Sequence, residues 1–161
     1  MSRRRLAALL VLAFAACAPA GCGSPPDLKQ ALQVTDVSNG WFDAGIVEAK
    51  NKLVPSVTFK LKKNADVNLP SVSLNVSFVF VGDQDPNDDV FVQSIPFEGS
   101  ETAPITVRSK VGFTGDPPQT RAEMLQNSRF RDMDARIFAK QSSSQWVELQ
   151  RVRIARQVLT H

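Results

Sequence analysis

The chain has 161 residues, a formal net charge of +3, and 43% hydrophobic, 22% charged and 7% aromatic residues. Its apolar content is too high for a disordered chain and too low for a protein with many membrane spans. The excess charge comes from Arg3, Arg4 and Arg5, because without them the 19 basic residues fall to 16 and equal the 16 acidic ones. We therefore expect no nucleic-acid partner, since such proteins keep a basic surface.

The first 21 residues have the layout of a signal peptide. Three arginines precede an apolar run from Leu6 to Ala16, and small residues follow it. The run is too short to cross a bilayer, which takes about 20 residues. We expect residues 1–21 to be the signal peptide, residues 22–31 a tether and residues 32–161 the folded domain.

Both cysteines of the chain lie at the end of this segment. Cys22 follows Ala20-Gly21, and Cys17 follows Ala15-Ala16. Small residues before a cysteine resemble the lipobox of bacterial lipoproteins, in which the cysteine is acylated and becomes the new N-terminus. Cys22 is the preferred lipid attachment site because of its small-residue context, and Cys17 is the alternative. Secretion with cleavage near Ala20, which leaves a free thiol, is a second alternative.

This resemblance implies a location in the bacterial cell envelope. The acylated cysteine would make membrane lipid a partner, and stable anchoring takes more than one acyl chain. Gly23, and not Asp, follows Cys22, which by the same resemblance implies the outer membrane with the domain facing the periplasm. No cysteine follows position 22, so the domain is expected to fold without a disulfide.

Residues with period-2 hydrophobic alternation dominate the rest of the chain. The alternation is clearest over residues 56–62 and 71–81, where helical spacing would scatter the apolar side chains around the axis. The same criterion predicts further strands over residues 32–37, 90–95, 105–113, 130–140 and 146–154. Residues 38–40 are predicted as a turn, and residues 41–47 as an irregular edge.

Two short segments favour a helix. Thr120-Arg121-Ala122-Glu123 is a capping-box sequence, which predicts a helix over about residues 121–127 that crosses between two sheets. Residues 28–32 are predicted to form a brief helical turn.

These elements predict an all-β fold. About seven strands, separated by turns and accompanied by one short helix, favour an immunoglobulin-like antiparallel β-sandwich. A small antiparallel β-barrel is the alternative, because strands of this kind can also close into a barrel.

Three stretches resemble extracytoplasmic immunoglobulin-like domains of the bacterial FxLYD type. They are residues 59–64, 76–83 and 97–102, and the likeness extends loosely over residues 32–113, although the chain contains no Tyr. The C-terminal part is similar to small uncharacterised bacterial lipoproteins. The resemblance implies a fold and a location, and it implies no activity.

The side chains that usually carry catalysis are scarce. The chain has one histidine, His161, at its last position, so no internal Ser-His-Asp or Cys-His arrangement can form. We therefore predict that the protein is not an enzyme and has no cofactor.

An acidic loop is the one candidate for a metal site. Oxygen ligands at alternate positions suit Ca²⁺, and the candidate ligands are Asp83, Asp85, Asn87, Asp88 and Asp89. The loop departs from an EF-hand because Asp88 replaces the glycine and Ser94 replaces the bidentate Glu. The alternative is a solvated hairpin loop in which these residues provide turn geometry.

Two further features could contact a partner. Arginines of the predicted C-terminal hairpin could form a basic strip for an anionic partner, or could protect a sheet edge; they include Arg129, Arg131, Arg151, Arg153 and Arg156. Trp41-Phe42 could form an exposed binding patch, whereas burial between the sheets is the usual fate of a Trp.

These observations together favour a non-enzymatic, membrane-anchored lipoprotein. We expect it to act outside the cytoplasm as an interaction or accessory module for an unknown envelope protein. The alternative is a module that binds a small ligand or Ca²⁺ through the acidic loop, residues 83–89.

Overall fold

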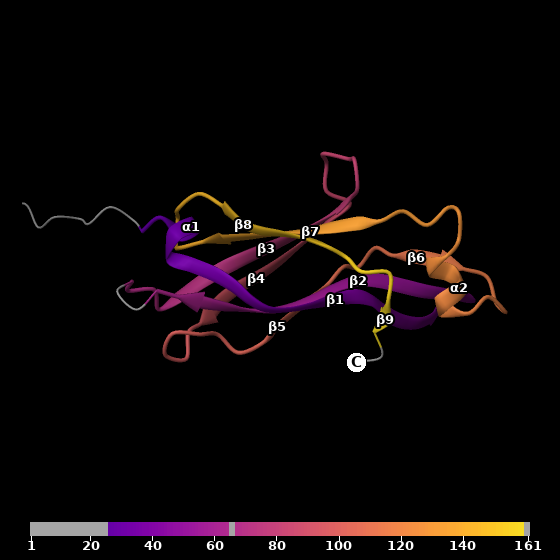
Figure 1. Cartoon of the computed structure of the whole chain (residues 1–161), viewed down its shortest axis with the longest axis horizontal. Coiled ribbons are helices and arrows are strands. Elements are labelled where there is room, and N and C mark those ends of the chain that lie inside the picture. The colour runs from indigo at the N-terminus through magenta and orange to yellow at the C-terminus, as the bar shows by residue number, and fades with distance from the viewer. Residues whose placement is uncertain (1–25, 65–66, 160–161) are drawn as a thin grey trace, which may run out of the picture.

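The computed structural model describes residues 26–64 and 67–159, which form two stacked β-sheets (Figure 1). Strands account for 57% of the structure and helices for 7%. The predicted antiparallel β-sandwich is therefore confirmed. The described residues contain nine strands, against about seven expected, and two short helices, which confirm the predicted helix after Thr120 and the predicted helical turn at residues 28–32. Their sheets remain separate layers, so the alternative barrel is wrong.

The first sheet is built on one long antiparallel hairpin. Its strand order is β5-β2-β1-β9, and β6 also pairs with β2. The short strand β9 runs parallel to β1, whereas the other pairings are antiparallel. The bounds are Leu32–Val47 for β1, Lys50–Lys63 for β2, Ile105–Arg108 for β5, Phe113–Gly115 for β6 and Val158–Leu159 for β9.

The second sheet is antiparallel throughout, in the order β4-β3-β7-β8. Its strands are β3 (Ser71–Phe80), β4 (Asp88–Pro96), β7 (Met133–Lys140) and β8 (Val147–Arg153). The turn between β7 and β8 makes the C-terminal hairpin that the sequence predicted.

Alternate residues of the central strands form the core between the sheets. In β3 and β7 every second side chain is buried, and these side chains face those of β2. Each buried aliphatic or aromatic side chain contributes about 1.5–3 kcal/mol through removal of apolar surface from water. The largest fully buried side chains of these strands include Phe59, Leu61, Leu74, Phe78, Met133 and Ile137.

The predicted turn at residues 38–40 is wrong, because these residues lie inside β1. Gly40 does not form a turn but allows another part of the chain to pack closely against β1. A methyl group at this position would lie 2.9 Å from atoms of Gln157 and Leu159. These two residues belong to the C-terminal segment that adds β9 to the sheet. Strand β9 could not be predicted from the sequence, because a two-residue strand carries no periodicity.

The predicted strand over residues 105–113 is two strands, β5 and β6. The interruption coincides with two hydrogen bonds that end the pairing there. Asp88, at the start of β4, accepts them from the Ser109 hydroxyl at 2.7 Å and from the Lys110 N–H at 2.8 Å. A carboxylate from the other sheet thus takes the backbone donor that a continuous strand would use.

Both helices begin with a side-chain cap. Helix α2 (Arg121–Leu125) has the predicted capping box between Thr120 and Glu123, and it joins β6 of the first sheet to β7 of the second. It ends two residues earlier than predicted. Helix α1 (Leu28–Ala31) is capped by Asp27, and its apolar residues are buried in the core. Residues 28–31 of the predicted tether, residues 22–31, therefore form a helix that packs on the core.

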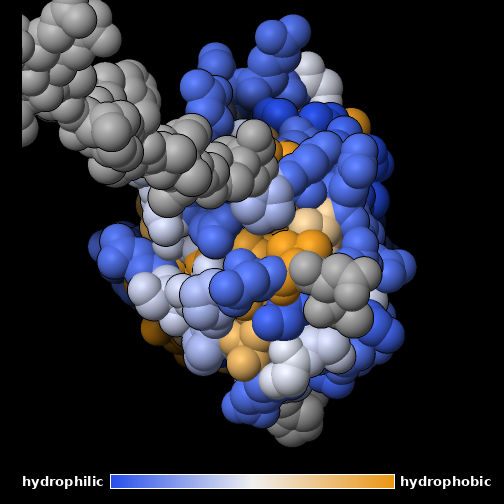
Figure 2. Space-filling view, turned by 90° about the vertical axis from the view of Figure 1, so that its left-hand side faces the viewer, coloured by the Kyte–Doolittle hydropathy of each residue, from blue (hydrophilic) through white to orange (hydrophobic). Residues whose placement is uncertain are grey.

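The two ends of the sandwich carry different features. Helix α1, the start of β1 and the β7–β8 turn lie at one end, and the 81–87 loop, β6 and α2 lie toward the other (Figure 1). The surface seen at the α1 end is mostly hydrophilic around a small hydrophobic centre (Figure 2). Trp41 lies nine positions after Leu32, which corresponds to about 30 Å along β1. None of the helices in the described part of the chain could cross a membrane.

Candidate functional site

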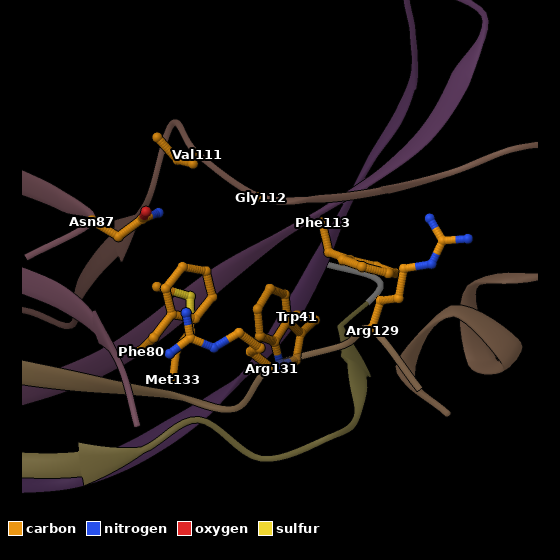
Figure 3. A pocket seen from close by; sticks show the side chains of 9 residues that line it. All are labelled: Trp41, Phe80, Asn87, Val111, Gly112, Phe113, Arg129, Arg131 and Met133. Atoms are coloured by element: carbon orange, nitrogen blue, oxygen red, sulfur yellow. The ribbon is translucent and has the colours of Figure 1, made fainter. Parts of the chain in front are cut away.

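An apolar cavity opens between the sheets at the end remote from α1 (Figure 3). Its volume is about 80 Å³. Strands of both layers contribute: Trp41 from β1 and Phe113 from β6 on one side, Phe80 from β3 and Met133 from β7 on the other. The remaining lining residues come from the loops, namely Asn87, Val111, Gly112, Arg129 and Arg131.

Trp41 forms part of the cavity wall and is held by aromatic packing. Its side chain is only 1% exposed, and its ring meets Phe130 edge-on at a centroid distance of 4.6 Å. Phe130 in turn meets Phe113 edge-on at 5.2 Å. The buried Trp41 Nε1 has no hydrogen-bond partner among the described residues, and such an unsatisfied donor costs about 1–3 kcal/mol.

The predicted exposed patch at Trp41-Phe42 is wrong. Trp41 points into the sandwich, and Phe42, the next residue of the strand, therefore points to the other face. Phe42 is half-buried beneath the Arg108 guanidinium, whose carbon lies 3.7 Å from the ring centroid. The two aromatic side chains thus serve different surfaces and cannot bind one partner side by side.

The two arginines at the cavity differ in their contacts. Arg131 lies over the Phe80 ring, 4.3 Å from its centroid, and pairs with Asp83 at 2.9 Å. The Arg129 side chain has no ion pair within the described part of the chain, and its guanidinium extends past Phe113, away from Trp41 (Figure 3). Arg131 is therefore locally neutralised, whereas the charge of Arg129 remains available.

The other arginines of the C-terminal hairpin do not form a basic strip. Each pairs with an acid: Arg153 with Asp134 at 2.5 Å and Arg151 with Glu148 at 3.6 Å. Arg156, just after β8, pairs with Asp132 at 2.6 Å. Glu148 also pairs with Arg136 at 2.7 Å, so acids lie beside both Arg151 and Arg153 and the arginines do not form an uninterrupted positive surface. Exposed pairs of this kind contribute little to stability individually.

The acidic loop does not bring its side chains together. Asp83 pairs with Arg131, Asp88 accepts from Ser109 and Lys110, and Asp89 accepts from Ser77 and Asn75. Asn87 lies at the cavity, and Asp85 is exposed. Within residues 26–64 and 67–159, no group of three or more His, Cys, Asp or Glu side chains could hold a metal ion. The geometry therefore gives the Ca²⁺ interpretation no support.

The hydrogen bonds at Asp88 also affect its ionisation. Burial disfavours the charged carboxylate, but the hydrogen bonds from the Ser109 hydroxyl and the Lys110 N–H outweigh burial. The pKa of Asp88 is consequently below its ordinary value. This carboxylate has a structural role in joining the two sheets beside the cavity.

The Asp132–Arg156 pair gives the fold a testable pH dependence. The hydrogen bond from Arg156 holds the pKa of the Asp132 carboxyl below its ordinary value, against a smaller opposing effect of burial. The charged form therefore stabilises the fold above the ordinary carboxyl pKa of about 4, and this contribution is lost as the pH falls through the lower folded-state pKa.

We expect Asp132→Asn to lower the free energy of unfolding at pH 7 by less than about 1 kcal/mol, as for other exposed pairs. The variant should lose less stability than the wild type as the pH falls below about 4. Urea denaturation over a series of pH values measures both effects. Asp85→Asn is the control, because Asp85 has no ion pair in the described chain. Identical pH profiles for Asp132→Asn and wild type would contradict the assignment.

An exposed aromatic pair that was not predicted from the sequence lies on the outer face of the second sheet. Phe91 is 59% exposed and Trp146 is 37% exposed, and their ring centroids lie 6.0 Å apart. The Lys140 ammonium lies 4.7 Å from the Trp146 ring centroid. Burial between the sheets is the usual fate of a Trp, but Trp146 precedes β8 at the edge of the sheet and remains partly exposed.

The cavity residues Phe80, Phe113 and Met133 were also missed as site residues. Each was predicted as part of a strand. Phe80 is the last residue of β3, whereas Phe113 and Met133 are the first residues of β6 and β7, and all three are apolar residues packed in or against the core. Alternation shows which face of a strand is apolar, but it does not show where the two sheets stop packing against each other. No pattern in the sequence could have identified the cavity.

Comparison with protein-family models, curated proteins and solved structures finds no match to the chain.

Proposed function

We propose that the protein is a non-enzymatic, lipid-anchored module of the bacterial cell envelope that binds an envelope protein with the cavity-bearing end of its sandwich. The proposal includes acylation of Cys22, with Cys17 as the alternative, and an outer-membrane location facing the periplasm. It also includes kinship with small bacterial lipoproteins that have FxLYD-type domains.

One observation carries the proposal. Arg129 and Arg131, two of the residues that the sequence singled out for partner binding, line an apolar cavity whose wall includes the buried Trp41. A concave apolar site with an aromatic wall and arginines at its edge has the composition of a binding hot spot. Exposed arginine beside aromatic surface is also enriched at protein interfaces.

The position of the cavity supports this arrangement. Cys22 lies four residues before Pro26, the first residue that the structure describes, and helix α1 follows at once. The cavity lies at the other end of the sandwich, about 30 Å along β1 from Leu32. An anchor at Cys22 would therefore hold the hydrophilic α1 end toward the membrane and leave the cavity accessible from the periplasm (Figure 2).

Photocrosslinking in intact cells tests the proposal. Val111 is 43% exposed at the cavity, so a photoreactive amino acid in its place should form a discrete crosslink to an envelope protein. The same amino acid at Gln33, which is exposed near α1, should not give this product. Arg129 and Arg131 are unchanged in both the Val111 and the Gln33 variants.

Charge reversal sharpens this experiment. We expect Arg129→Glu to reduce the Val111 crosslink at least about fivefold, because the partner would meet a repulsive charge in place of an attractive one. Arg151→Glu makes the same change of charge away from the cavity and should leave the crosslink intact. Crosslinks of equal strength from Val111 and Gln33, or an equal loss in both charge variants, would contradict the proposed binding end.

The alternative, a small-ligand module, finds less support. Sites that enclose a whole small molecule usually have mostly apolar walls and volumes of about 300–1,000 Å³. The hollow beside the acidic loop, whose lining includes Asp83 and Gln84, has about 320 Å³ but mostly polar walls, and the apolar cavity has only about 80 Å³. A hollow of that size is better suited to one side chain of a larger partner.

A further inference from the structure

We propose that the cavity receives one branched aliphatic side chain of the partner protein, and that a carboxylate next to that side chain pairs with Arg129. This inference rests on the proposed function, because it assigns the chemistry of the partner at the same site.

The size of the hollow selects the side chain. A cavity of about 150 Å³ lined by aliphatic and aromatic side chains accommodates benzene. The present cavity has about half that volume, which suits the isobutyl group of a leucine better than an aromatic ring. Its walls are the faces and edges of Trp41, Phe80, Phe113 and Met133, and none of these side chains ends in a charge.

The hollow is preformed, because packing holds each wall in place. Trp41 and Phe113 both contact Phe130 edge-on, and Met133 is 2% exposed. Gly112 contributes no side chain, and its backbone packs against Leu53 so closely that even a methyl group would meet the Leu53 carbonyl. A partner side chain would enter a space that already exists, so little binding energy is spent on rearranging the walls.

The charges at the mouth select an acid beside the aliphatic group. Asp83 already neutralises Arg131, which is held against Phe80. Arg129 is exposed and has no acidic partner within the part of the chain that the structure describes. The nearest acid in sequence, Asp132, pairs with Arg156. The mouth therefore keeps one positive charge, and a carboxylate on the partner complements it.

Peptide titration with a tryptophan reporter tests this assignment. The chain has two tryptophans, so Trp146→Phe makes Trp41, in the cavity wall, the only reporter. The full-length protein in detergent is titrated with three capped tetrapeptides: acetyl-Gly-Leu-Asp-Gly-amide, its Leu-Asn isostere, and its Gly-Asp counterpart without the aliphatic group. The Leu-Asn peptide removes the charge at constant shape, and the Gly-Asp peptide removes the apolar group at constant charge.

We expect the Leu-Asp peptide to change the Trp41 emission saturably, and the Leu-Asn peptide to bind about threefold to fivefold more weakly, as for one exposed ion pair. The Gly-Asp peptide should give no response. Arg129→Gln should abolish the preference for Asp over Asn, and Arg151→Gln should preserve it. Val111→Phe, a change at an exposed position, should block the cavity and remove every response while the circular dichroism spectrum stays unchanged.

Equal affinities for the Leu-Asp and Leu-Asn peptides would overturn the inference, as would the absence of any response to the Leu-Asp peptide. The experiments distinguish failure of this inference from failure of the proposed function. A Val111 crosslink that Arg129→Glu abolishes would sustain the binding end even if the peptides showed no preference. Conversely, peptides that discriminate as expected would sustain the chemistry of the cavity even if no crosslink formed in cells.

Discussion

Replacement of Trp41 by alanine should lower the free energy of unfolding by about 3–5 kcal/mol. Trp41 is nearly fully buried, packs edge-on against Phe130 and lies in the middle of the strand that joins β2 to β9. Its removal would leave a hole much larger than the present cavity, and the surrounding β-strands could not close it without breaking their pairing. Loss of the unsatisfied Nε1 offsets only part of this cost.

Trp146→Ala is the matched control, because it removes the same side chain from the surface. Trp146 is 37% exposed and contacts Phe91 and Lys140 on the outer face of the second sheet. We expect this variant to change the free energy of unfolding by less than about 1 kcal/mol. Urea denaturation followed by circular dichroism measures the free energy of unfolding of both variants, because this signal does not depend on tryptophan fluorescence. Equal losses for the two would show that Trp41 does not organise the core.

The second large effect on stability is expected when Gly112 is replaced by a larger residue. A methyl group at this position would lie 2.8 Å from Val54 Cγ1 and 2.9 Å from the Leu53 carbonyl carbon. The Leu53 backbone belongs to β2 and pairs with Phe113, so it cannot move without disturbing β6. We expect Gly112→Ala to destabilise the fold by about 2–3 kcal/mol, which exceeds the gain of less than 1 kcal/mol from restricting the unfolded chain.

Val111→Ala tests whether this effect is specific to the glycine. Val111 is the preceding residue and is exposed, so its truncation should cost less than about 1 kcal/mol. Thermal unfolding of both variants under one set of conditions provides the comparison. A Gly112→Ala variant as stable as the wild type would mean that β6 can move away from β2 at little cost, and the walls of the cavity would then not be rigid.

Particular strands show how far the sequence could predict the fold. The alternation in β3 and β7 placed Val72, Leu74 and Ile137 on inward faces, and each is buried. The capping box at Thr120 correctly located α2. Both features are local, because periodicity and capping depend on residues within a few positions of one another.

The misassigned elements depend on distant contacts. Gly40 suggested a turn, but it lies inside β1 because the C-terminal segment passes against it. The interruption between β5 and β6 depends on Asp88, some twenty residues earlier in the chain. Local propensity gives way to tertiary contacts at these places, and no single-sequence pattern records such contacts.

The candidate site was predicted only in part. Arg129 and Arg131 were proposed for partner binding and lie at the cavity. Arg151 instead pairs with Glu148 of its own strand, and Arg153 pairs with Asp134 of the neighbouring strand. The sequence contained both signs of charge, but the pairing of Arg153 with Asp134 depends on the strand register of β7 and β8. The register of β3 and β4 likewise places Asp89 of the acidic loop beside Ser77 and Asn75, and not beside the other acids of the loop.

The intact mass of the mature protein tests the central claim most directly. After extraction from the membrane fraction, we expect a chain that begins at Cys22 and carries a mass increment for fatty acyl groups on that residue. A Cys22→Ser variant should lack the increment, and a Cys17→Ser variant should keep it. An unmodified mature chain, or one that begins after Cys22, would contradict the proposed anchoring of this β-sandwich at the envelope.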